Sequence, residues 1–326
     1  MKDLLMYLVL AGIGYFTGSR LKKQTVLLCL AGRVQTAAVV ILLVAMGMRM
    51  GANPEVTDNL GTIGGVSAVL TLAVMLFSGA AACAARKLIG MDKFAQVATG
   101  ETGSEIDSEA GREEGKDGSR KLIAVLILIS VTGGFLCGWF IVPQLFAGRM
   151  AEFEKAAGGA VSLGLYVLLY LIGFNMGTDG TVIAQFRKVG MRILIFPLFV
   201  MAGAFLAALL CAALMGFSPR EALAVTAGFG WYSIAPGIIL EAGYAACGAM
   251  SFMHCIMREY FSLLLVPFVA KKAGYMEAVG ICGAAAMGVC LPIVEKSTRS
   301  DVAIYSFISG LVHTLTVPVL IPLLLS

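Results

Sequence analysis

Charged residues are scarce in this chain. Lys, Arg, Asp and Glu make up 13% of its 326 residues, whereas 59% of them are hydrophobic. A soluble domain carries roughly a quarter charged residues, so too little polar surface exists here to cover a globule in water. The apolar residues also form runs of about 18 to 25, long enough to cross a bilayer as helices. The composition therefore excludes a soluble protein and predicts an all-α polytopic membrane protein.

Metal ligands and enzyme motifs are also few. The chain has two histidines and eight cysteines, with no CxxC spacing. A structural zinc site or a disulfide framework is not expected, and neither is a cofactor. HExxH, GxSxG and P-loop patterns do not occur, so an enzyme is not expected. A membrane-embedded enzyme, with Ser233 and His254 as a dyad, is a less favoured alternative. The net charge of +4 comes from short basic clusters between apolar runs, which is typical of membrane topology and does not indicate nucleic acid.

Eight apolar runs are long enough to span a bilayer: about 3–19, 26–50, 62–85, 122–142, 159–177, 191–214, 246–270 and 301–325. Two further stretches, about 221–242 and 277–295, are apolar but interrupted by Gly and Pro. We expect both to be re-entrant, meaning that each enters and leaves the membrane on one side. The segment 88–120 has many charges and no apolar periodicity, which is typical of a disordered linker.

Lys and Arg positions predict the orientation, because cytoplasmic loops carry an excess of them. Arg20 and Lys22 follow the first run, and basic residues also flank the segment 88–120. These clusters place both termini outside and the linker 88–120 in the cytoplasm. Lys271 and Lys272 stay on the inner side if 221–242 is re-entrant. The chain is expected in the plasma (inner) membrane as a multi-pass protein.

Two internal repeats are visible. AMGMRMG (45–51) resembles LIGFNMG (171–177) at an offset of 126 residues, as from 47 to 173. AVTAGFGWYSIAPGIILE (224–241) resembles AVGICGAAAMGVCLPIVE (278–295) at an offset of 54, as from 224 to 278. An odd number of spans separates each pair, so the second copies are inverted, as in many transporters. Chance similarity between apolar, Gly-rich segments is the alternative.

The repeats predict four parts of the chain. They are a first three-span repeat over 1–87, the linker 88–120, an inverted three-span repeat over 121–216, and two units over 217–326. Each of these last units contains one broken segment and one span, and together they form the expected transport core.

The broken segments are candidate binding sites, because a helix interrupted in the membrane frees backbone groups that must face a cavity or ligand. The N-termini of half-helices there can bind a carboxylate. A kinked but continuous helix is the alternative. Trp231 and Tyr232 either stack on a ligand or belong to the interfacial aromatic belt, and Glu241 and Glu295 either line a vestibule or lie at the interface. The candidate residues are Gly228, Gly230, Trp231, Tyr232, Ser233, Glu241, Gly283, Gly288, Pro292 and Glu295.

Glu259 is the single residue that the sequence indicates most strongly as a site residue. It follows Arg258 near the middle of the run 246–270, where a charge is costly and normally faces a cavity or a partner. Glu259 is therefore expected to hold a proton or a cationic substrate. A structural Arg258–Glu259 pair is the alternative, although neighbours on a helix point about 100° apart. For His254 and His313, hydrogen bonds that pack helices together are the favoured interpretation.

Three motifs carry a family resemblance: TAGFGWYS (226–233), MREYFSLLLVP (257–267) and ICGAAAMGVCLP (281–292). Together with Gly47, Gly173 and Gly310, they resemble the lysine exporter family LysO over most of the chain. The resemblance implies export of L-lysine and its toxic analogue thialysine, with proton antiport. It also implies eight spans with both termini outside.

The family uses two intramembrane acids, and this chain departs from that pattern. One acid is the Glu after Arg, which corresponds to Glu259. The other is an Asp that follows Met in the re-entrant motif, where this chain has Gly288. The leading hypothesis is a secondary active exporter of L-lysine or a similar cationic amino acid. It acts by proton antiport through Glu259. A carrier of another solute, such as an organic anion, with a structural Glu259 is the alternative. The expected partners are the cationic amino acid, the proton and the lipid bilayer. The sequence leaves open whether the chain forms a homodimer.

Overall fold

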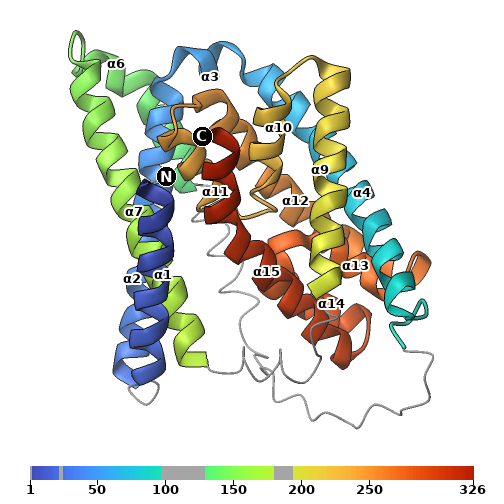
Figure 1. Ribbon diagram of the computed structural model, residues 1–326. Helices are drawn as coiled ribbons and strands as arrows, with labels where there is room; N and C mark the ends of the chain where they lie inside the picture. Colours follow the sequence, from blue (N-terminus) through green and yellow to red (C-terminus); the bar gives the residue numbers. More distant parts are fainter. Residues whose placement is uncertain (1, 22–24, 97–128, 180–193) are drawn as a thin grey trace.

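The computed structural model describes residues 2–21, 25–96, 129–179 and 194–326. Helices account for most of this part of the chain (Figure 1). In order they are α1 (Lys2–Arg20), α2 (Thr25–Ala52), α3 (Pro54–Asp58), α4 (Leu60–Ile89), the π-helix η1 (Cys137–Ile141), α6 (Val142–Leu145), α7 (Met150–Asp179), α9 (Ile195–Met215), α10 (Pro219–Thr226), α11 (Ala235–Glu241), α12 (Ala245–Lys272), α13 (Tyr275–Cys282), the 3-10 helix η3 (Gly283–Met287), α14 (Leu291–Ser297) and α15 (Ser300–Leu325).

The predicted all-α polytopic fold is confirmed. Among the described residues, six helices are long and apolar enough to cross a membrane, and they belong to α2, α4, α7, α9, α12 and α15. The shorter apolar helix Ile129–Leu145 and helix α1 overlap the two remaining predicted runs. Every predicted span therefore overlaps a helix of the described residues.

The predicted linker begins too early in the sequence. Helix α4 continues to Ile89, and Met91 and Ala95 are buried. The Phe94 ring packs edge-on against Tyr275, with 5.5 Å between centroids, and Lys93 O accepts a hydrogen bond from Tyr275 N. Residues 88–96 are thus ordered, because apolar side chains within the charged stretch pack on α13. Residues 97–120 of the predicted linker lie outside the described part.

Four helical segments pack so closely that their backbones touch, with no side chains between them at the contact points. We call these four segments the scaffold. They are α1, α2, α7 and the helix 129–145. A Cβ on Gly14 or Gly173 would lie 2.0 Å from a carbonyl oxygen of the facing helix in the α1–α7 pair. In the pair formed by α2 and the helix 129–145, a Cβ would lie 2.0 Å from a carbonyl oxygen of the facing helix at Gly51 and 2.2 Å at Gly138. Such close approach of small residues is a principal means of helix association in membranes.

The remaining helices form a second body, which we call the core: α4, α9 and the segment from α10 to α15. Figure 1 shows the scaffold helices α1, α2 and α7 on one side of the molecule and α4, α9 and α13 on the other, with α15 running diagonally between them. A Cβ on Gly203 would lie 2.5 Å from Phe77 O, so α9 and α4 also pack closely.

Both stretches predicted to be broken are broken. Residues 221–242 form the half-helices α10 and α11, and residues 277–295 form α13, η3 and the start of α14. In Figure 1, α10 and α11 lie toward one end of the bundle and α13 and α14 toward the other. The alternative of continuous kinked helices is therefore wrong. The division of the whole chain into inverted repeats remains a prediction.

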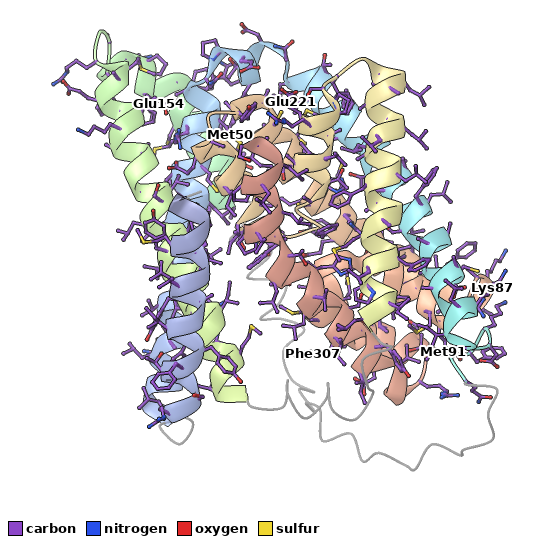
Figure 2. The ribbon with its side chains drawn as sticks, in the orientation of Figure 1. Met50, Lys87, Met91, Glu154, Glu221 and Phe307 are labelled. Atoms are coloured by element: carbon purple, nitrogen blue, oxygen red, sulfur yellow. The ribbon has the colours of Figure 1, made fainter. Side chains whose placement is uncertain are left out.

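Figure 2 shows Glu154 and Glu221 at one end of the bundle, and Lys87 and Met91 at the other. Both chain termini lie toward the end that carries Glu154 (Figure 1). Which end faces the cytoplasm remains a prediction from the positive-inside rule.

Candidate functional site

The two breaks touch one another, and we call the contact between residues 227–234 and 283–290 the crossover. Ala284 N donates a hydrogen bond of 2.9 Å to Phe229 O, which joins one break to the other. Gly283 has a φ of +59°, and a Cβ there would lie 2.3 Å from Phe229 O and 2.8 Å from Arg258 Cζ. Glycine is therefore required at 283 both by conformation and by space.

Arg258 lies at the crossover and is fully buried. Its Nε donates to Ile281 O at 3.1 Å, and its Nη2 donates to Gly280 O at 3.4 Å and to Ser78 Oγ at 3.3 Å. The two carbonyls belong to the last turn of α13, so the guanidinium stabilises the negative end of that half-helix. Its Nη1 has no hydrogen-bond partner among the described residues.

Glu259 follows Arg258 but does not pair with it. It is the fifteenth residue of the 28-residue helix α12, counted from Ala245, and its side chain is half-buried. The ion pairs of the described residues do not include Glu259 or Arg258. Tyr232, from the first break, lies within electrostatic range of Glu259. The middle of α12 thus carries a basic and an acidic residue, and neither has an oppositely charged partner among the described residues.

His254 makes a hydrogen bond between helices, as the sequence predicted, whereas the hydrogen bond of His313 stays within α15. His254 Nδ1 lies 2.9 Å from Thr71 Oγ1, and His313 Nδ1 lies 2.6 Å from Ser309 O. Both rings are fully buried, and neither Nε2 has a partner within the described residues.

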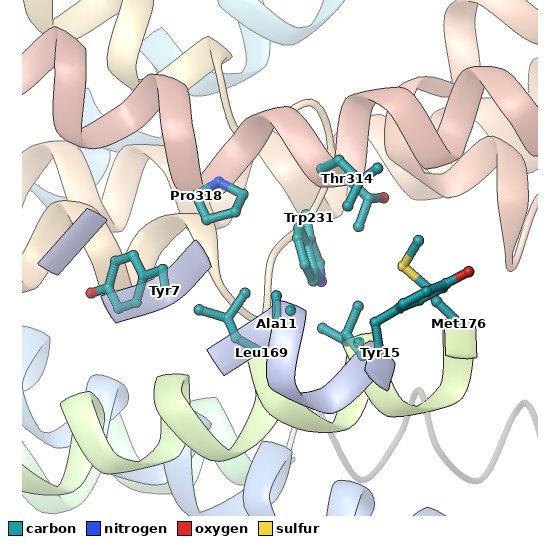
Figure 3. A pocket seen from close by; sticks show the side chains of 12 residues that line it. Tyr7, Ala11, Tyr15, Leu169, Met176, Trp231, Thr314 and Pro318 are labelled. Carbon is teal, nitrogen blue, oxygen red and sulfur yellow. The ribbon is translucent and has the colours of Figure 1, made fainter. Parts of the chain in front are cut away.

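A cavity of about 220 Å³ lies beside the crossover, between the scaffold and the core. Figure 3 shows the Trp231 ring projecting into it, with Tyr15 and Leu169 on the scaffold side and Thr314 and Pro318 on α15. The lining is almost entirely apolar, which suits the hydrocarbon part of a ligand.

The other predicted site residues lie in the breaks or on the half-helices beside them. Glu241 ends α11 and bonds to Arg49 Nη1 and, at 2.5 Å, to Ser162 Oγ. Pro292 and Glu295 lie on α14, and Ser233 is half-buried in the first break. Gly288 is exposed, and a Cβ there would meet no atom within 4 Å. The crossover therefore brings together Gly228, Gly230, Gly283 and Arg258, with Trp231 and Tyr232 beside it.

Some residues that build the site were not predicted. Ser78 and the carbonyls of Gly280 and Ile281 hold Arg258. Phe229 carries the hydrogen bond between the breaks at a φ of +48°. For Phe229 a signal existed in the sequence, because it stands between two glycines in a predicted break. Every residue has a backbone carbonyl group, so the sequence gives no signal for the carbonyls that bind Arg258.

Two broken helices that meet midway along spanning helices define a class of protein, the membrane proteins built like secondary transporters. The family model described as "Lysine exporter LysO" matches residues 128–325. This chain belongs to that family.

Two curated relatives support the assignment. The chain is 26% identical over 186 residues to "Lysine exporter LysO" of Escherichia coli (strain K12), which is 57% of this chain and 62% of that protein. It is 26% identical over 199 residues to "Putative lysine exporter" of Haemophilus influenzae, which is 60% of this chain and 92% of that protein. The match thus spans less than two thirds of the E. coli relative. No solved structure matches the chain at comparable significance.

Proposed function

We propose that this protein is a secondary active exporter of a cationic amino acid of the lysine type, coupled to proton antiport. Membership of the lysine exporter family supports the solute class. The broken helices and their contact at the crossover support a transport mechanism of the alternating-access kind.

One observation carries the proposal: adjacent, oppositely charged residues at the middle of α12 have no charged partner among the described residues. Burying a charge without a partner is costly, and the cost falls when a ligand supplies the opposite charge. A basic amino acid carries both a carboxylate and ammonium groups. Its carboxylate fits the free Nη1 of Arg258, and its side-chain ammonium fits Glu259.

Glu259 then provides the coupling. An ionised carboxylate in the hydrocarbon region needs either a proton or a cation, so the proton and the substrate ammonium compete for it. Exporting a +1 solute against the membrane potential costs about 2.3 kcal/mol per 100 mV. One-for-one exchange with a proton cancels this charge movement. This chain has Gly288 at the position where the family has its second intramembrane acid, so Glu259 provides the coupling without a second acid.

The test is transport into everted membrane vesicles, followed with labelled lysine and a pH-sensitive dye. Glu259→Gln keeps the shape and removes the charge, so we expect loss of lysine-driven proton movement with normal expression and insertion. Glu152→Gln is the matched control, because Glu152 is an exposed acid at the end of α7. Wild-type rates and pH dependence in Glu259→Gln would contradict the proposal.

A carrier for organic anions is the second candidate, and the unpaired Nη1 of Arg258 favours it. The same vesicles decide between the two. A monocarboxylate without an amino group that outcompetes lysine would favour the anion carrier.

A further inference from the structure

His313 occupies the position in the second broken unit that Glu259 occupies in the first. The repeat offset of 54 residues that relates 224–241 to 278–295 also takes position 259 to 313. The helices agree with this register. Glu259 is the fifteenth residue of α12, counted from Ala245, and His313 is the fourteenth of α15, counted from Ser300. His254 has no such relation, because position 308 is Ile.

The hydrogen bond of His313 determines which ring nitrogen is free. Ser309 O lies 2.6 Å from Nδ1, and a carbonyl oxygen accepts but does not donate. Nδ1 therefore carries the hydrogen, and Nε2 of the neutral ring presents a lone pair. That atom is buried and has no partner among the described residues. A buried acceptor of this kind lacks a donor that a ligand could supply.

The free Nε2 belongs to the crossover. The His313 ring packs edge-on against Phe229, with 4.9 Å between centroids, and Phe229 O accepts the hydrogen bond from the second break. Arg258 lies within electrostatic range of His313. Other buried polar atoms without partners lie on the helices that meet here: Thr226 Oγ1, Ser309 Oγ and Arg258 Nη1.

These groups suit the head group of an amino acid. Arg258 would repel a lone ammonium, but an α-amino acid brings a carboxylate beside its ammonium and neutralises Arg258 as it binds. We propose that His313 Nε2 accepts a hydrogen bond from the α-ammonium group of the substrate while Arg258 Nη1 binds its α-carboxylate. This inference rests on the proposed function and assigns the end of the substrate remote from Glu259.

The test removes the same contact from the protein and from the substrate. His313→Asn keeps an N–H donor near the position of Nδ1 and removes Nε2, and 6-aminohexanoate is lysine without its α-amino group. We expect wild-type vesicles to export lysine faster than 6-aminohexanoate by roughly tenfold or more, as for a hydrogen bond to a charged group. In His313→Asn the lysine rate should fall to the 6-aminohexanoate rate, which itself should not change.

His254→Asn is the matched control. His254 is also buried in mid-helix with a bonded Nδ1 and a free Nε2, but its Nδ1 faces Thr71 of α4, whereas the His313 ring packs on Phe229 of the first break. His254 also lies outside the repeat relation. Both rates should stay at wild-type values in this variant. Equal losses for both substrates in His313→Asn would show a structural role and overturn the inference, as would no loss for either.

A binding measurement separates this inference from the proposed function. The chain has two histidines, so nitrogen NMR of labelled histidine in detergent resolves each ring, with the two Asn variants providing the assignment. Lysine should shift the His313 Nε2 signal, and 6-aminohexanoate should not. Wild-type vesicles that export neither compound overturn the proposed function. In that case a lysine-specific shift still supports the head-group site, and its absence overturns it.

Discussion

The two broken segments both belong to the core, but the first also packs on the scaffold. In the first, α11 packs on the scaffold: a Cβ on Gly237 would lie 3.3 Å from a Leu165 methyl group, and Glu241 bonds to Arg49 and Ser162. In the second, α13 packs on α4 of the core. A Cβ on Gly280 would lie 2.6 Å from Ala82 Cβ, and Glu277 pairs with Arg86 at 2.9 Å.

This difference indicates where the molecule can open. A rigid-body movement of the core against the scaffold leaves the contact between α13 and α4 intact. It breaks the contacts of α11 with α2 and α7, and it opens the apolar cavity between Trp231 and α1. We therefore expect the first segment to be the movable junction and the second to be an anchor.

The largest expected loss of stability is in the second broken segment, the anchor. Glu277→Ala leaves Arg86 buried without its partner, since their side chains are 5% and 10% exposed. Loss of one member of a buried pair costs about 3–5 kcal/mol. Thermal and denaturant unfolding in detergent measures this cost. The control is Glu152→Ala, which removes an exposed pair with Arg149 at 3.7 Å and should cost at most about 0.5 kcal/mol. Equal losses of stability in the two variants would contradict a special role of the Glu277–Arg86 pair.

The next effect compares two glycines of the second break. Gly283→Ala places a Cβ against Phe229 O and Arg258 at a positive φ, which we expect to cost roughly 3 kcal/mol from strain and overpacking. Gly288→Ala meets no atom within 4 Å and should change the melting temperature little. Gly288→Asp should also fold, which makes the missing family acid directly testable in the vesicle assay. A clear fall in the melting temperature of Gly288→Ala would contradict the conclusion that a Cβ at this position meets no other atom.

The smallest effect is at the movable junction. Arg49→Ala removes the partly exposed links from α2 to Glu241 and Glu154, at a cost of about 1 kcal/mol. We expect a maleimide that cannot cross the membrane to label Ser162→Cys about fivefold faster, the factor that 1 kcal/mol gives. The measurement uses a background without the native cysteines. An unchanged labelling rate would show that these links do not hold the junction closed.

Much of this architecture could be predicted from the sequence, because the bilayer imposes simple requirements. A continuous apolar run of sufficient length must be a helix, so each predicted span overlaps a helix, although α7 begins at Met150, well before the predicted start at 159. Gly228, Gly230 and Pro236 interrupt one such run, and their backbone requirements made the first break predictable. Glu259 stood out because an acid in an apolar run is unusual.

The pairing of helices could not be predicted in the same way. Glycines of α1 touch carbonyl groups of α7, and a carbonyl group has the same chemistry at every position. Arg258 likewise bonds to carbonyls of residues 280 and 281. For His313, the sequence favoured a bond to another helix, whereas Nδ1 bonds within α15 to Ser309 O. The free nitrogen became visible only when the partner of Nδ1 was known.

The scaffold pairing also has a consequence for biosynthesis. Helix α1 ends at Arg20, but its partner α7 begins at Met150. At about 5–20 residues per second, the ribosome supplies that partner on the order of ten seconds later. During this interval the glycine face of α1 is in the bilayer without the helix that it fits. We expect premature pairing with another glycine-bearing helix to compete with correct assembly during this interval, until α7 completes the scaffold.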